Sequence, residues 1–202
     1  MPGFDEKQKY VPAEMGLAEA ISRRWSPRAF ADRRIAKEDL RRLFEAARWA
    51  PSSYNEQPWR FLVGLKGDST YQRIFDSLTE FNQGWAKTAP VLILTVARTE
   101  FSSNGRPNHH GLHDLGLATA MLMIQATDLG LHTHGMAGFD HAKARATFGI
   151  PPGYEMGAVI AVGYFGNPED LAGGMKEREM APRQRRPLEE IVLADWAKPA
   201  EL

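Results

Sequence analysis

Two arginine clusters stand near opposite ends of the sequence, and their spacing suits the binding of an anion. The first, RRWSPRAF, places Arg24, Ser26 and Arg28 at every second position. Pro27 favours an extended backbone, in which side chains two positions apart point to the same side. Two guanidinium groups and a hydroxyl on one side suit a phosphate group or a ribityl chain.

The second cluster, PRQRRPLEE, repeats the pattern with Arg183 and Arg185. The alternative interpretation is that each cluster is a solvated charged patch, and for one cluster alone that interpretation is favoured. The two clusters therefore indicate a binding site only in combination with other features of the chain.

A third stretch, WAPSSYNEQPWRF, lies between Trp49 and Phe61. Prolines, serines and amides stand here between two tryptophans, directly after a predicted helix. The stretch is either an ordinary loop or a polar surface that holds something flat.

The elements that position these residues alternate between helices and strands. Helical spacing of apolar residues predicts helices at 16–26, 37–49, 69–81 (capped by Ser69 or Thr70), 111–130 and 140–148. Apolar runs of strand length predict strands at 59–66, 90–97, 131–137 and 157–166. This order implies an α/β or α+β sandwich with helices on both sides of one sheet.

The length of 202 residues predicts a single domain over 1–202, with an N-terminal arm at 1–14 and a C-terminal extension at 193–202. The helix at 111–130 is apolar nearly all round, which predicts burial on several sides and is explained by a subunit interface.

Composition excludes several classes of function. Lys plus Arg equals Asp plus Glu, at 25 each, so no global charge favours nucleic acid or an anionic membrane. The chain has no cysteine, which excludes disulfides, thiolate nucleophiles and Cys-ligated metals. The N-terminus does not resemble a signal peptide and VLILTVA is too short to cross a bilayer, so we expect a cytoplasmic protein.

Common catalytic and nucleotide-binding motifs are missing from the sequence. There is no G-x-G for a dinucleotide fold, no P-loop and no G-x-S-x-G elbow. His109, His110 and His113 lie close together, and His132 and His134 alternate, but no carboxylate has a convincing metal-ligand spacing. We therefore interpret the histidines as loop and strand residues and predict no metal site.

Four stretches, SRRWSPRAF, APSSYNEQPWRF, AGFD and PRQRRPLEEIV, resemble in order and separation the nitroreductase family of FMN-dependent oxidoreductases. The resemblance runs roughly from Leu17 to Val192. It implies an α+β fold with a central mixed, mostly antiparallel sheet, helices on both sides and an intertwined homodimer. It also accounts for the missing G-x-G, because this family binds FMN without that loop.

The resemblance assigns roles around the cofactor. Arg24, Ser26 and Arg28 would hold the FMN phosphate, ribityl chain and pyrimidine edge, and Arg183 and Arg185 would close on the phosphate. Trp25, within the first motif, replaces a smaller or polar residue and is included among the cofactor contacts.

Further residues are assigned to the flavin ring. Asn82 would reach the pyrimidine edge, and the backbone N–H groups of Ala137 and Gly138 would approach flavin N5. Ala137 stands where family members often carry Glu, and Trp85 where some have Lys.

The dimer completes the site that the resemblance implies. Pro51, Ser52, Ser53 and Asn55 would contact the FMN bound mainly by the partner subunit. The helix from Leu112 to Leu129 would form the dimer core, while Gln57, Pro58 and Trp59 would be structural.

The function implied is hydride transfer from NAD(P)H through FMN to a nitroaromatic, a quinone or another small acceptor, with no indispensable catalytic side chain. The short segment at 100–110 favours a broad-acceptor reductase. Three alternatives stay open: specialised flavin chemistry such as dehydrogenation, dehalogenation or flavin destruction, a flavin-binding module with little turnover, and a structural domain without flavin.

Overall fold

A four-stranded sheet forms the centre of the protein in the computed structural model, which describes residues 4–201. The strand order is β1-β2-β4-β3, and each neighbouring pair is antiparallel. The strands are β1 (Trp59–Leu65), β2 (Val91–Arg98), β3 (His132–Met136) and β4 (Tyr154–Gly163). Residues 1–3 of the predicted arm and Leu202 of the predicted extension lie outside the described residues.

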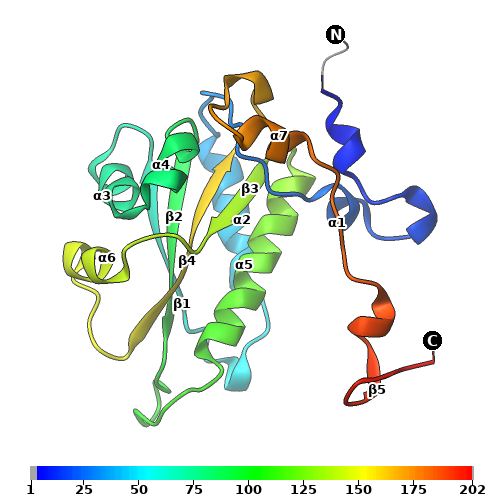
Figure 1. The fold of residues 1–202 in the computed structure, drawn as a ribbon. Coiled ribbons are helices and arrows are strands. Elements are labelled where there is room, and N and C mark those ends of the chain that lie inside the picture. The colour runs from blue at the N-terminus through cyan, green and yellow to red at the C-terminus, as the bar shows by residue number, and fades with distance from the viewer. Residues whose placement is uncertain (1–3, 202) are drawn as a thin grey trace.

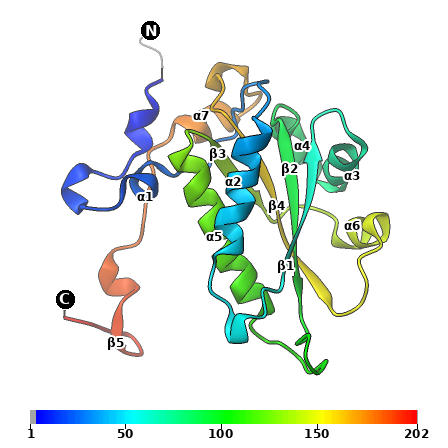
Figure 2. The same ribbon diagram turned by 180° about the vertical axis from the view of Figure 1, so that it is seen from behind.

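Helices cover both faces of this sheet. On one face, α2 (Lys37–Arg48) and α5 (Gly111–Asp128) lie side by side, and on the other lie α3 (Ser69–Ser77), α4 (Glu80–Ala86) and α6 (His141–Phe148) (Figures 1 and 2). Strand β2 contributes alternate residues to a hydrophobic core on each face. The expected α+β class, with helices on both sides of a mostly antiparallel sheet, is confirmed.

Shorter elements lie near the two ends of the chain, except for η3, which lies between α2 and β1. They are the turns η1 (Glu6–Lys9), η2 (Ala13–Met15), η3 (Ser53–Asn55), η4 (Pro168–Asp170) and η5 (Leu188–Glu190), the helices α1 (Glu19–Arg23) and α7 (Met175–Met180), and the hairpin of β5 (Leu193–Asp195) and β6 (Lys198–Pro199). Both termini project from the same side of the molecule, while α7 and the 100–110 loop lie at opposite ends of it (Figures 1 and 2).

The prediction of one helix over 69–81 is wrong. Leu78 has extended backbone angles, φ −66° and ψ 150°, and separates α3 from α4. Leu78 forms a bridge with Phe139, and the Thr79 N–H donates to the Gly138 carbonyl at 3.1 Å. The N-cap of α3 is Asp68, whose carboxylate accepts the Tyr71 N–H, rather than Ser69 or Thr70.

Other boundaries differ from the predictions by a few residues. Strand β4 begins and ends three residues earlier than expected, because Tyr154 pairs with Arg98 while Phe165 bridges to Phe30 outside the strand. Helix α1 is shorter than expected, and α7 was not predicted. Within residues 4–201, no helix combines the length and apolar character needed to span a membrane.

Candidate functional site

The segment from Arg24 to Ala29 runs extended along the edge strand β3. Trp25, Pro27 and Ala29 are buried, and the residues between them are partly exposed, which is the alternation that an extended backbone produces. The His134 Nδ1 lies 2.9 Å from the Pro27 carbonyl and ties the segment to β3. Because a carbonyl only accepts, the neutral imidazole carries its proton on Nδ1.

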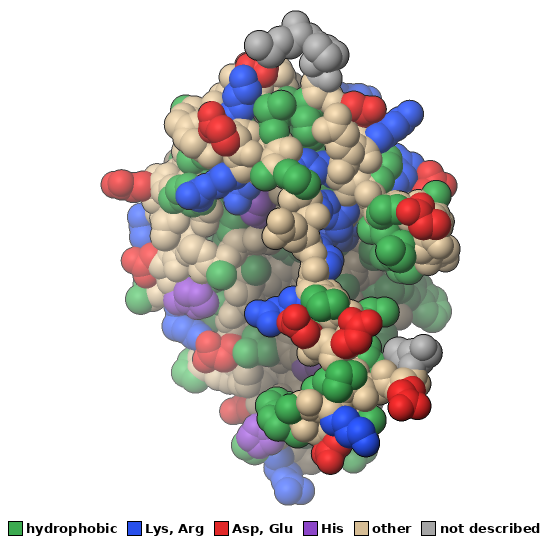
Figure 3. Space-filling model, turned by 45° about the vertical axis from the view of Figure 1, so that its right-hand side comes forward, with side chains coloured by type: hydrophobic (Ala, Val, Ile, Leu, Met, Phe, Trp, Pro, Cys, Tyr) green, Lys and Arg blue, Asp and Glu red, His purple; other side chains and the backbone are tan. Residues whose placement is uncertain are grey.

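The two arginine clusters meet in one cavity of about 250 Å³. Its wall includes all five residues of the two clusters that the resemblance assigned to FMN, namely Arg24, Ser26, Arg28, Arg183 and Arg185. The C-terminal tail leaves the body beside several Lys and Arg side chains (Figure 3). The remaining wall residues are Lys9, Trp25, Arg178, Glu179, Ala181 and Pro182.

Like charges are held together in this cavity. Burial lowers the pKa of Arg24, and the nearby Arg185 lowers it further. Burial also lowers the pKa of Arg183, with Arg185 and Arg24 adding to the effect. Arg24 Nη1 lies 3.2 Å from Ser26 Oγ, whereas the buried Arg28 Nε has no hydrogen-bond partner in the described part of the chain. The geometry offers unpaired donors to an anion.

One carboxylate, Glu179 of α7, organises the wall. Glu179 is 1% exposed and accepts the backbone N–H groups of Arg28 at 2.8 Å and Ala29 at 3.1 Å. Its Oε2 also lies 3.9 Å from Arg28 Nη1. This side chain therefore joins the C-terminal segment to the first arginine cluster.

A second group of predicted residues lies at the turn after β3. Asn82, on α4, is buried, and its Nδ2 donates to the Gly138 carbonyl at 2.9 Å. A Cβ at Gly138 would lie 2.7 Å from that Nδ2, so a larger residue does not fit there. Neither Ala137 nor Gly138 donates its N–H to an acceptor among residues 4–201, which leaves two backbone donors at the turn.

The two tryptophans that depart from the family pattern are buried. Trp25 packs against His132 and Phe165, with ring centroids 5.8 and 5.3 Å away. Trp85 packs against His134, with centroids 4.5 Å apart. Trp25 therefore contributes an aromatic wall behind the arginine cavity, and Trp85 supports the strand that links the cavity to the turn.

The stretch from Pro51 to Gln57 lies far from the arginine cavity, at the opposite end of the molecule from α7 (Figures 1 and 2). Its backbone has positive φ at Tyr54, Asn55 and Gln57, a conformation rare outside glycine. The Ser53 N–H donates to the buried Asp114 carboxylate at 3.0 Å. A single chain therefore does not bring Pro51, Ser52, Ser53 and Asn55 to the arginine cavity.

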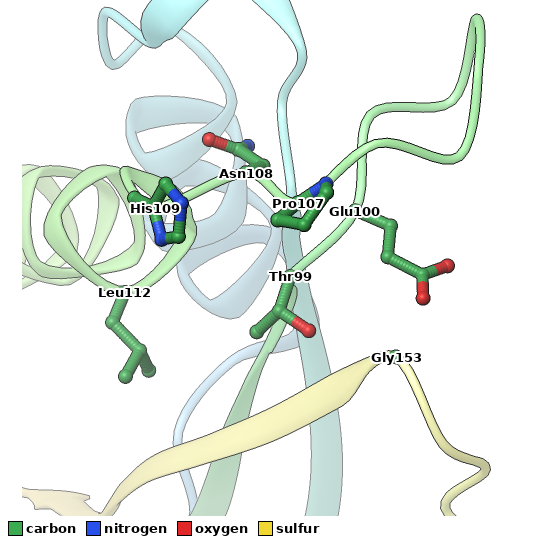
Figure 4. A pocket seen from close by; sticks show the side chains of 7 residues that line it. All are labelled: Thr99, Glu100, Pro107, Asn108, His109, Leu112 and Gly153. Carbon is green, nitrogen blue, oxygen red and sulfur yellow. The ribbon is translucent and has the colours of Figure 1, made fainter.

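A larger cavity, of about 460 Å³, lies at this same end beside the start of α5 (Figure 4). Thr99, Glu100, Pro107, Asn108, His109, Leu112 and Gly153 line it. Asn108 is buried and its Oδ1 accepts the His110 N–H at 3.0 Å, so it shapes the entry into α5. In the described part of the chain, no group of three or more His, Asp or Glu side chains is arranged to hold a metal ion.

Sequence reasoning missed five lining residues of the arginine cavity, and two of them, Lys9 and Glu179, are buried charged residues. Both are at least 97% buried, although charged residues in a polar sequence context ordinarily face solvent. Glu179 lies among other charged residues in MKEREM, and Lys9 lies in the similarly polar stretch EKQK. No local sequence pattern distinguishes either residue from its exposed neighbours. Only their tertiary contacts identify them.

Known proteins are similar to this chain in sequence and in fold. An uncharacterized 15.4 kDa protein of Mycolicibacterium smegmatis is 34% identical over 149 residues, covering 69% of this chain and 99% of that protein. A protein of Archaeoglobus fulgidus, named "Putative NADH dehydrogenase/NAD(P)H nitroreductase", is 30% identical over 148 residues, covering 71% of this chain and 82% of that protein. The solved structure of an oxidoreductase containing FMN has a TM-score of 0.84 and 33% identity, covering 96% of this chain and 97% of that chain.

The sequence profile described as the nitroreductase family matches residues 21–80 and 65–164 of this chain. The matched range includes the first arginine cluster, the 51–57 stretch, Asn82 and the turn after β3. The second arginine cluster lies beyond it, and the structure brings that cluster back to the first. The chain belongs to the nitroreductase family.

Proposed function

We propose that this protein is an FMN-dependent oxidoreductase that takes a hydride from NAD(P)H and reduces a small acceptor such as a nitroaromatic or a quinone. The observation that carries the proposal is the meeting of Arg24, Ser26 and Arg28 with Arg183 and Arg185 in one cavity. We expect the protein to act in the cytoplasm as a single domain per subunit.

The residues fit FMN in two places. The cavity supplies guanidinium groups and a hydroxyl, including the unpaired Arg28 Nε, which suit a phosphate monoester. The turn at Ala137 and Gly138 supplies two backbone N–H groups that have no acceptor in the described part of the chain, and neither residue has a side chain larger than a methyl group. The similar oxidoreductase that contains FMN supports the same cofactor.

FMN held by these residues would supply the redox chemistry, namely hydride acceptance from NAD(P)H and electron donation to the acceptor. The residues of this chain bind and orient it. The N–H groups of Ala137 and Gly138 would donate to the ring, and Asn82 restrains the turn by holding the Gly138 carbonyl, which lies in the peptide that follows them. Fixed donors aimed at a site of developing negative charge stabilise that charge without reorganisation.

We propose that a homodimer completes the site. Pro51, Ser52, Ser53 and Asn55 would contact the FMN bound mainly by the partner subunit. Helix α5 carries exposed apolar side chains, Leu112 at 48% and Met121 at 42%, which support its role as the dimer core.

Steady-state oxidation of NADH and NADPH, with menadione or nitrofurazone as acceptor, tests the function. We expect a yellow protein that releases FMN on denaturation and turns over both classes of acceptor. A yellow protein without acceptor-dependent turnover would favour a flavin-binding module, and turnover confined to another substrate class would favour specialised flavin chemistry. A colourless protein that binds no added FMN would favour a structural domain.

Single substitutions test the phosphate end. Arg28→Ala or Arg185→Ala should each weaken FMN binding by about 1.5–3 kcal/mol, the value of a hydrogen bond to a charged group. Arg186→Ala is the matched control, because Arg186 lies next in the chain but pairs with Glu190 at 3.2 Å. Flavin retention equal to that of the unmodified protein in both test variants would contradict the assignment.

A further inference from the structure

Lys9 is buried in the wall of the arginine cavity, although it belongs to the N-terminal arm that precedes the family match. Its side chain is 3% exposed, and its Nζ donates to the Ala181 carbonyl. The same Nζ lies 5.2 Å from the centre of the Trp25 ring. A lysine ammonium has three donors, so one carbonyl leaves two of them to other partners.

Several contacts fix the arm in this position. The Lys9 carbonyl accepts Arg183 Nη1 at 2.6 Å, so the arm contacts the second arginine cluster directly. Val11 exchanges hydrogen bonds with Ser22, through the Val11 N–H at 3.1 Å and the Ser22 hydroxyl at 2.8 Å. Further along, Glu6 Oε2 lies 3.4 Å from His132 Nε2. The arm is therefore attached both to the C-terminal segment and to β3.

The charges in the cavity wall do not balance within the chain. Six cationic side chains line the cavity, and Glu179 is the one carboxylate among its lining residues. Glu179 already accepts the backbone N–H groups of Arg28 and Ala29. Burying an ammonium with incomplete partners is costly, and burial accordingly lowers the pKa of Lys9. A doubly charged anion would satisfy the cations that the chain leaves in excess.

We propose that Lys9 is a direct ligand of the phosphate of the bound cofactor and that the N-terminal arm forms one wall of the phosphate site. This inference rests on the proposed function, because it takes FMN to be the ligand. The phosphate would then join three parts of the chain: the arm at Lys9, the extended segment at Arg24 to Arg28, and the C-terminal segment at Arg183 and Arg185.

The test compares FMN with riboflavin, which has the same ring and ribityl chain but no phosphate. Flavin-free full-length protein is titrated with each flavin, and binding is followed by quenching of flavin fluorescence. The test variant is Lys9→Met, which keeps the length of the side chain and removes its charge. Lys7→Met is the matched control, because Lys7 lies in the same turn but is exposed.

For Lys9→Met we expect FMN affinity to fall by about 10- to 100-fold, while riboflavin affinity changes less than about twofold. Lys7→Met should leave both affinities unchanged, and Lys9→Arg should keep the preference for FMN. An equal loss of both flavins in Lys9→Met would mean that Lys9 only holds the arm, and would overturn the proposal, as would FMN binding as tight as in the unmodified protein.

The failure of this inference is distinguishable from failure of the proposed function. If the unmodified protein binds neither flavin, the FMN-dependent function fails and the role of Lys9 fails with it. If the unmodified protein prefers FMN to riboflavin and Lys9→Met retains that preference, only the role of Lys9 fails.

Discussion

The arginine cavity and the Pro51–Gln57 loop differ in how far a single chain completes them. The cavity gathers three segments of one chain around buried Lys9 and Glu179. The loop lies at the opposite end of the molecule, and Tyr54 at its tip is 91% exposed. This contrast supports a cofactor site divided between subunits, with the phosphate end built by one chain and an edge of the ring contact contributed by the other.

The two regions also hold their backbone in different ways. In the cavity segment, Arg24 to Ala29, no residue has positive φ. Glu179 accepts the N–H groups of Arg28 and Ala29, and the Gly166 N–H donates to the Ala29 carbonyl. The loop has left-handed backbone at Tyr54, Asn55 and Gln57, and such residues cost on the order of 1–3 kcal/mol each. Two side chains restrain it: Ser52 Oγ accepts the Gln57 N–H at 3.0 Å, and Asp114 accepts the Ser53 N–H. Strain held by surrounding contacts is typical of functional sites.

The largest effect is expected at Gly166, which positions the arginine segment. Its N–H donates to the Ala29 carbonyl at 2.9 Å, and a Cβ there would lie 2.6 Å from the Phe30 carbonyl carbon. Gly166→Ala should therefore cost about 3 kcal/mol, because backbone cannot move aside as a flexible side chain can. The measurement is thermal unfolding, with a melting temperature lowered by roughly 6–12 °C.

Gly174→Ala is the control for that substitution, because the nearest atom to its Cβ would be Glu177 Oε2 at 4.0 Å. It should leave the melting temperature nearly unchanged. A Gly166→Ala protein as stable as the control would mean that the cavity segment adapts to the added methyl group and is not held in place by close backbone packing at Gly166.

The second effect concerns pH and His134, which holds the arginine segment to β3. Burial lowers the pKa of His134 to about 4. An unfolded histidine has a pKa of about 6.5, so between these values the unfolded chain binds more protons than the folded one, and stability falls as the pH falls. From pH 7 to pH 5 this should remove about 2 kcal/mol from the free energy of unfolding.

Denaturant unfolding of the protein and of His134→Gln at the two pH values isolates this contribution. Gln keeps an amide donor for the Pro27 carbonyl but does not titrate. We expect the difference between pH 7 and pH 5 to shrink by about 2 kcal/mol in the variant. An unchanged difference would mean that the imidazole is not buried in its neutral form.

Local patterns in the sequence predicted much of the fold. The alternation around Pro27 and the apolar runs of β2 and α5 depend on neighbours in the chain, and those elements lie where the sequence placed them. The break at Leu78 was missed because it depends on Phe139 and Gly138, which are distant in sequence. The start of β4 was missed for the same reason, because it depends on pairing with β2, which is distant in sequence.

The residues of the candidate site also divide into those that a local sequence pattern predicts and those that depend on contacts distant in sequence. The arginines could be selected because their spacing is a local pattern, and the structure then brought the two clusters together. Lys9 and Glu179 could not be selected, since a buried charge has no signature in composition or periodicity. The support of the Ser53 N–H by Asp114 was likewise invisible, because 61 positions separate the two residues.

The smallest effect is expected at Asp114, which restrains the loop rather than the cavity. Asp114→Asn replaces a charged acceptor of the Ser53 N–H with a neutral one of the same shape, and charge-assisted bonds are roughly twice as strong. The loss should be about 1 kcal/mol, or roughly fivefold in flavin affinity. Asp128→Asn, at the exposed end of the same helix, is the control.

For Asp114→Asn, the comparison between FMN affinity and riboflavin affinity is more informative than the size of either loss. If the loop contacts the ring bound by the partner subunit, Asp114→Asn should weaken FMN and riboflavin by the same factor, because the phosphate is held elsewhere. Lys9→Met should weaken FMN alone. If Asp114→Asn also affected only FMN, the loop and the cavity would not be separate ends of one site, and the division of labour between them would have to be abandoned.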